Sequence, residues 1–489
     1  MKNIAFLFVP AMLWAATPSV TIDQLIGMAE SASGEFAAEA LIRIAGIDTV
    51  EKPRKIALLE EAFSRAAEAQ LPYKRRAAIT KIPGPAGIFN RVYAQGLDAM
   101  SLRLKAVNAM LPLDPQKAAE MFRRIPPVKL PLLTCEDYMV YDVDGYYELL
   151  GRIEAQTLTA AEIEKGDEFR LLQPYIAAVD SPVELPAAAH LIADSKVNDK
   201  DFQQLVGDFA KAMAGISGDD RSFTYAAAGP QIQAIVKAAQ SRKISPLLLL
   251  ESYRLYIVKH MSGARCVDDD LMINEGGSFA FADSRVTDQQ QGPDPALYFN
   301  AHLRMPPLQD IQEQEVTPSK LEGAASELRG CDDDTCKAIV GKYSDLIWDS
   351  QRNPYTPAHK ETPEWQKQFQ DFLTALAAWQ PQGASFSAEH FREKCALYND
   401  VSSVAPKAPG RESVLRAELD FVRKSKTATE NRAQWFLPIS ALIGRVTLDP
   451  QGLGRLTGDL RDAGDPIVTL FVELEAVAPR TPDLIMPLI

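Results

Sequence analysis

Apolar residues recur at helical spacing along nearly the whole chain, whereas alternating strand-like runs are scarce. Phe36, Ala40, Leu41 and Ile44, for example, fall on one face of a helix. Pro53 stands in the first turn of the next predicted helix, where proline is tolerated, and the Asp114-Pro115 pair marks a further start. Other predicted helices cover about 92–107, 137–155, 160–178, 199–215, 229–241, 245–261, 335–350, 363–379, 387–400, 410–425, 428–444, 450–461 and 465–477. The pattern predicts an all-α protein.

The helical pattern stops between Cys266 and Thr317. This stretch contains Glu-Gly-Gly, three consecutive glutamines and several prolines, which break helices. It is too long for an ordinary connection and is typical of a functional loop or a linker. The predicted organisation is a leader at 1–16, helical domains at 17–265 and 318–489, and an irregular segment at 266–317.

Short antiparallel helix pairs in succession favour an irregular array like an α-solenoid. Leu59, Phe63 and Ala66 have the second-helix spacing of a tetratricopeptide unit, although Pro72 comes one residue late, and 114–123 has a similar character. The chain therefore resembles such repeats over one or two units. As a whole it resembles uncharacterised exported all-helical proteins of bacteria, a likeness that implies no activity.

The first residues have the layout of a secretory signal. Lys2 precedes an apolar run from Ile4 to Ala16, which is short for a membrane span and is followed by polar residues. The alternative is a buried N-terminal helix. Export to the periplasm or the extracellular space is the favoured interpretation, with no membrane insertion after the signal is removed.

Charge and cysteines narrow the class of protein further. The net charge is -13, from 65 acidic and 52 basic residues, which argues against nucleic acid as a partner.

In an oxidising compartment Cys266 could pair with Cys331 or Cys336, closing the irregular segment. The alternative is a local Cys331–Cys336 bridge. Cys135 and Cys395 are then expected as buried thiols.

Motifs for catalysis and for cofactors are missing from the sequence. The five histidines are too scattered for a zinc hydrolase motif. The string from Gly383 to Ser387 ends in serine where a nucleophile elbow needs glycine. The glycines at 452, 454 and 458 have the wrong spacing for a dinucleotide loop. We therefore expect no cofactor.

Acidic clusters give the only metal candidates. The segment 140–151 imitates part of a calcium loop but lacks its first and twelfth ligands, and is better interpreted as a helix weakened by Gly145. Two runs of three aspartates could hold calcium, or could simply be solvated helix ends. These runs are Asp268, Asp269 and Asp270, and Asp332, Asp333 and Asp334.

Glu251-Ser252 provides the only enzyme-like string. It resembles the catalytic segment of lytic transglycosylases, which implies that Glu251 would act as the acid, but the motif's continuation is absent. Tyrosines at 141, 146, 147, 175, 253 and 256 could form a binding surface, although helical spacing favours a core role. The leading hypothesis is a non-enzymatic scaffold for a protein or peptide partner, and the alternative is cleavage of a cell-wall polymer.

Overall fold

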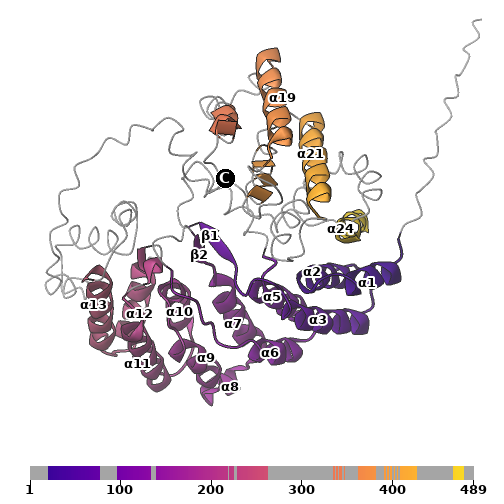
Figure 1. The fold of residues 1–489 in the computed structure, drawn as a ribbon. Coiled ribbons are helices and arrows are strands. Elements are labelled where there is room, and N and C mark those ends of the chain that lie inside the picture. Colours follow the sequence, from indigo (N-terminus) through magenta and orange to yellow (C-terminus); the bar gives the residue numbers. More distant parts are fainter. Residues whose placement is uncertain are drawn as a thin grey trace, which may run out of the picture.

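A computed structural model describes residues 20–77, 96–133, 139–218, 220–224, 228–262, 362–380, 408–426 and 466–477, with scattered positions between 334 and 405. The predicted leader at 1–16 and the irregular segment at 266–317 lie outside these residues. Within the described part, the all-helical prediction is confirmed (Figure 1). A two-stranded antiparallel sheet is the exception, and it pairs β1 (Arg75–Ala77) with β2 (Met139–Tyr141).

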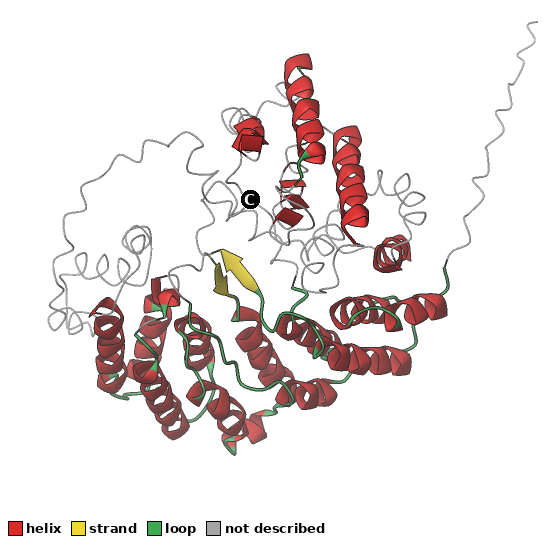
Figure 2. Cartoon of the chain, viewed as in Figure 1, coloured by secondary structure: helices red, strands yellow, loops and turns green. Residues whose placement is uncertain are grey.

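Most of the helices between α1 and α13 follow one another with short connections (Figure 2), and the connection from α6 to α7 is a longer one. The first group is α1 Ile22–Glu30, α2 Gly34–Ala45, α3 Lys52–Ala66, α5 Ala99–Met110, α6 Pro115–Arg123 and α7 Asp144–Thr157. The second is α8 Ala160–Glu164, α9 Asp167–Ala177, α10 Leu185–Asp194, α11 Asp199–Gly215, α12 Gly229–Ser241 and α13 Leu247–Ser262, with the 3₁₀ turns η1 Pro182–Glu184 and η2 Arg221–Thr224. Near the C-terminus lie α19 Pro363–Ala378, α21 Ala408–Lys426 and α24 Pro466–Val477.

The helices from α1 to α13 form a curved two-row array. Helices α2, α5, α7, α10 and α12 pack in succession along one row, and α9, α11 and α13 pack in succession along the other. Each helix therefore contacts mainly its near neighbours, which is the defining property of a solenoid. The predicted arrangement of antiparallel helix pairs is confirmed.

Capping residues fix where several helices begin. Asn198 Oδ1 accepts the backbone N–H of Asp201 at 3.0 Å, which confirms the predicted start of α11. Asp114 caps α6 in the same way, and Pro115 follows it in the first turn. At α13, the N–H of Leu247 faces Ser245 Oγ at 3.5 Å.

Two predicted helices are shorter than the apolar spacing indicated. In the described part of the helix expected over about 92–107, residues 96–98 are not helical and α5 begins at Ala99, because Gly96 has a φ of +60° and Asp98 caps the helix. The helix expected over 137–155 was wrong at its start, because Met139–Tyr141 is a strand. The helix over 160–178 divides at Gly166, whose φ is +80°.

Helix α10 was not predicted at all. Pro182 precedes this helix and Pro186 lies within it, and both stand in first turns, where the missing N–H costs nothing. The alanines between 187 and 193 then continue the helix and pack against α12.

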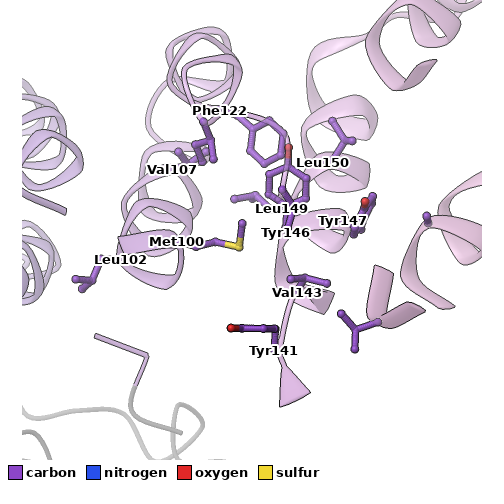
Figure 3. Close-up of a cluster of buried hydrophobic side chains, with 14 of the residues drawn as sticks. Met100, Leu102, Val107, Phe122, Tyr141, Val143, Tyr146, Tyr147, Leu149 and Leu150 are labelled. Atoms are coloured by element: carbon purple, nitrogen blue, oxygen red, sulfur yellow. The ribbon is translucent and has the colours of Figure 1, made fainter. Parts of the chain in front are cut away.

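The core of the array is continuous and rich in aromatic residues. Figure 3 shows the part between α5, α6 and α7, where Phe122 lies 5.1 Å from Tyr146 and Tyr146 lies 5.3 Å from Tyr147, between ring centroids. Tyr141, Tyr146, Tyr147, Tyr253 and Tyr256 are buried, and Tyr175 is partly buried and packs against the same core. The core interpretation of these tyrosines is confirmed.

The C-terminal helices add to the array at its first helices. Helix α24 packs against α1 and α2, and Phe471 meets Phe36 edge to face at 6.2 Å. A second apolar cluster lies around Trp365, Phe369 and Phe372. Cys395 is a buried thiol, as expected.

Candidate functional site

Glu251 lies on α13, where it forms an ion pair with Arg254 at 3.1 Å. Its neighbours along this side of the helix are the exposed leucines 247, 248 and 255. The apolar partners of α13 lie elsewhere on the helix, at residues such as Leu249, Tyr253 and Ile257. Glu251 is therefore half-exposed on the surface of α13.

The remaining sequence candidates lie mostly beyond the described residues. Asp268, Asp269, Asp270, Asp332 and Asp333 lie there, as do the disulfide candidates Cys266, Cys331 and Cys336. Asp334 is described, as an exposed residue of helical backbone. Within the described ranges no group of three or more acidic, histidine or cysteine side chains could hold a metal ion, and no helix is long and apolar enough to cross a membrane.

One extended segment of the chain comprises residues 126–133 and has the sequence Pro-Pro-Val-Lys-Leu-Pro-Leu-Leu. We call this segment the strap. It follows α6 and has neither helical nor strand structure. Its three prolines fix φ and disfavour helix in the residues before them. Figure 1 shows the strap as a drawn-out trace that runs from the end of α6 toward the α12 side of the array.

The array holds the strap by its backbone and by buried side chains. The N–H of Lys129 donates to the Tyr73 hydroxyl at 3.3 Å, and the N–H of Leu133 donates to Asp220 Oδ1 at 3.3 Å. Val128 is 3% exposed and Leu133 is 2% exposed. Backbone contacts of this kind hold an extended chain whatever its sequence, and the burial of alternate side chains adds preference for certain residues.

Asp220 connects the strap to a buried hydrogen-bond network. Its Oδ1 also accepts the Ser222 N–H at 2.9 Å, and its Oδ2 accepts the Ser181 hydroxyl at 3.4 Å. The Ser181 N–H in turn donates to Glu184 Oε2 at 3.1 Å. Glu184 Oε1 accepts the Tyr147 hydroxyl at 2.7 Å. The network thus joins the strap, η2, η1 and α7.

Burial dominates the electrostatics of this network. It raises the pKa of Glu184 to about 7, against the lowering effect of the Tyr147 hydrogen bond. It also raises the pKa of the Tyr147 hydroxyl well above its ordinary value. The pKa of Asp180 is raised mainly by burial, and the positive charge of Lys129 in the strap opposes that rise. The ammonium group of Lys129 in the strap therefore lies near carboxyl groups of the array, Asp180 among them.

His260 lies at the same end of the array. Its ring stacks on Phe223 with centroids 4.7 Å apart, and its Nδ1 lies 2.9 Å from the Tyr256 carbonyl oxygen. A carbonyl only accepts hydrogen bonds, so Nδ1 carries a proton. Burial lowers the pKa of His260, which favours the neutral ring. His260 is an aromatic core residue in this position.

Sequence reasoning missed the residues of this site, which include Tyr73, Asp220 and Glu184. One signal was present: the string from Ser181 to Glu184 has the pattern of a capping box, and the structure contains that box. The three prolines of 126–133 also marked an extended segment. No pattern could show that Asp220 meets Leu133, because the pair is 87 residues apart.

Comparison with known proteins adds no identity to this site: no protein-family model, curated protein or solved structure shows significant similarity to the chain.

Proposed function

We propose that this protein is a binding protein whose helical array engages an extended segment of a partner protein or peptide. The observation that carries the proposal is the strap, an extended segment that the array already accommodates. Its backbone N–H groups at Lys129 and Leu133 are accepted by side chains of the array, from Tyr73 and Asp220. Segments of a partner with the same character would use the same contacts.

Charge and shape define the kind of partner that fits. The strap carries Lys129 beside Asp180, and Arg123 and Arg124 precede it in the chain. The whole protein carries a net charge of -13, which attracts basic segments over long distances. The proposed partner segment is therefore extended, contains proline and apolar residues, and has a net positive charge.

The test uses a synthetic peptide with the sequence of residues 125–133 as a probe. In the unmodified protein the strap competes with the peptide from within the chain, at an effective concentration that can reach the millimolar range. Replacing its buried side chains by Val128→Ser and Leu133→Ser releases the strap and leaves Tyr73 and Asp220 intact. We expect the peptide to bind this variant at least about tenfold more tightly than the unmodified protein.

Controls separate specific binding from unfolding. Adding Asp220→Ala to the released variant should abolish peptide binding, whereas Asp194→Asn, at an exposed position, should not change it. Circular dichroism should show the same helix content in all variants. If release of the strap unfolds the array, Lys129→Pro is a milder variant, which removes the N–H donated to Tyr73 together with the Lys129 charge. Lys129→Ala, which removes the charge and keeps the N–H, separates the two effects. Equal binding of a scrambled peptide would contradict the proposal.

Export is part of the proposal, and it rests on the charged and apolar pattern of residues 1–16. The mature protein should begin near Ala16 or Thr17. N-terminal sequencing of protein recovered from cells tests this, and an intact Met1 would refute export.

The enzyme alternative is tested through Glu251. If the protein released soluble fragments from purified cell wall, and Glu251→Gln abolished that release, the binding proposal would be wrong. The ion pair between Glu251 and Arg254 is instead what a solvated helix surface presents.

A further inference from the structure

Two arginines share one buried ring where α3, α5 and α6 meet. The guanidinium carbon of Arg103, on α5, lies 5.4 Å from the ring centroid of Phe63, on α3. That of Arg124, at the end of α6, lies 5.0 Å from the same centroid. Because both distances end at one point, the two guanidinium carbons lie within about 10 Å of each other.

Neither guanidinium has a carboxylate partner among the described residues. Nε of Arg103 is buried there without a hydrogen-bond partner. Other arginines in the same part of the chain are paired: Arg54 with Asp23, Arg65 with Glu61, and Arg170 with Asp167. Lys117, on α6, is paired as well, with Glu60 at 2.6 Å.

Electrostatic repulsion between the two groups is consistent with this geometry. Burial lowers the pKa of Arg103, and the positive charge of Arg124 lowers it further. A protein with a net charge of -13 thus keeps, at one aromatic ring, two positive charges without a carboxylate partner in the described part of the chain. Arg124 is exposed and Arg103 is half-buried, so a ligand can approach from the Arg124 side.

We propose that Arg103 and Arg124, with Phe63 as an apolar floor, form a binding site for a phosphate group, either free or on a larger ligand. A phosphate carries close to two negative charges at neutral pH and three acceptor oxygens. It can therefore neutralise both guanidinium groups at once and accept a hydrogen bond from each planar fork. A single carboxylate would leave one positive charge uncompensated. This site is separate from the strap contacts and does not depend on the proposed peptide binding.

Isothermal titration calorimetry of the full chain with inorganic phosphate tests the proposal, at constant ionic strength in chloride buffer. We expect one saturable site. Arg124→Gln, at an exposed position, should weaken binding at least about tenfold, and Arg103→Gln should do the same. The matched control is Arg123→Gln, which removes the same charge from the adjacent residue and should leave the affinity unchanged.

Three results would overturn the site. One is the absence of saturable binding at millimolar phosphate in the unmodified protein. Another is equal weakening by Arg123→Gln and Arg124→Gln, which would indicate a diffuse basic surface. The third is equal affinity for succinate, whose two carboxylates match the charge but not the geometry of phosphate. A phosphorylated serine, titrated in parallel, distinguishes free phosphate from a phosphate ester.

Discussion

Replacing Glu184 by glutamine should change how the stability of the array depends on pH. Glu184 is 1% exposed, and its Oε2 accepts the N–H groups of Asp180 and Ser181. A glutamine oxygen can accept both of these hydrogen bonds. Its amide can then donate to the hydroxyl of Tyr147, which rotates to accept. The substitution therefore keeps the geometry and removes only the titration.

The magnitude follows from the pKa of Glu184, which burial raises from 4.5 to about 7. A rise of about 2.5 pH units at 1.36 kcal/mol each corresponds to on the order of 3 kcal/mol. The folded protein holds this proton more tightly than the unfolded chain. The contribution to stability is thus complete below pH 4.5 and is lost as the pH rises through about 7. Glu184→Gln should be close to neutral at pH 5 and stabilising at pH 8.

Hydrogen exchange measured by mass spectrometry on peptides covering 181–194 suits this comparison. Tryptophan fluorescence does not, because the described tryptophans, Trp365 and Trp379, lie in the C-terminal helices. The pKa of Glu154 is also raised to about 7, so the difference between variant and unmodified protein is the relevant quantity. Glu162→Gln is the matched control, since Glu162 occupies an exposed capping box.

Parallel pH profiles for the unmodified protein and Glu184→Gln would refute this reasoning. A variant that is less stable at pH 8 would refute it as well, because ionised Glu184 would then be favourable in the folded state. The control Glu162→Gln should leave the profile between pH 6 and 8 unchanged.

Two further predictions concern the helices. Gly34→Ala should destabilise the array by about 1–3 kcal/mol, because the new Cβ would lie 2.6 Å from the Glu68 Cβ and 2.9 Å from the Arg65 carbonyl oxygen. Gly27→Ala should stabilise the array by about 0.5–1 kcal/mol, because nothing lies within 4 Å of the new Cβ. Urea unfolding followed by far-UV circular dichroism measures the stability of both glycine variants. Equal effects of the two substitutions would contradict the packing argument. Asn198→Ala should cost about 1 kcal/mol through the lost cap of α11, whereas Asn198→Asp should keep most of it.

The helices were largely predictable because their signals are local. Asn198 and Asp114 cap the helices that they were expected to start, and the tyrosines at helical spacing are buried. The errors also have local causes. Gly96 and Gly166 adopt positive φ values, which the spacing of apolar residues does not reveal. Pro182 and Pro186 lie in first turns, where proline is tolerated.

The strap and its network were not predictable, because their contacts join distant parts of the chain. Leu133 meets Asp220 across 87 residues, and Lys129 meets Tyr73 across 56. Such pairings depend on how far the array curves, which is set by the packing of several helices and not by any one of them. The meeting of Arg103 and Arg124 at Phe63 has the same origin, since these three residues come from three separate helices.

The four residues from Ser181 to Glu184 connect Asp220 with Tyr147 through buried hydrogen bonds. Pro182 and the capping box fix their backbone, so that the Ser181 hydroxyl points to Asp220 while its N–H points to Glu184. Glu184 then reaches Tyr147 on α7. A buried polar chain of this kind is favourable only when each member has its partner. Because Asp220 also accepts the Leu133 N–H, removing that N–H would leave a buried carboxylate oxygen with one donor fewer. Asp220 therefore favours a donor at this position, which the strap supplies here and which a partner segment with the same N–H group would supply in the proposed complex.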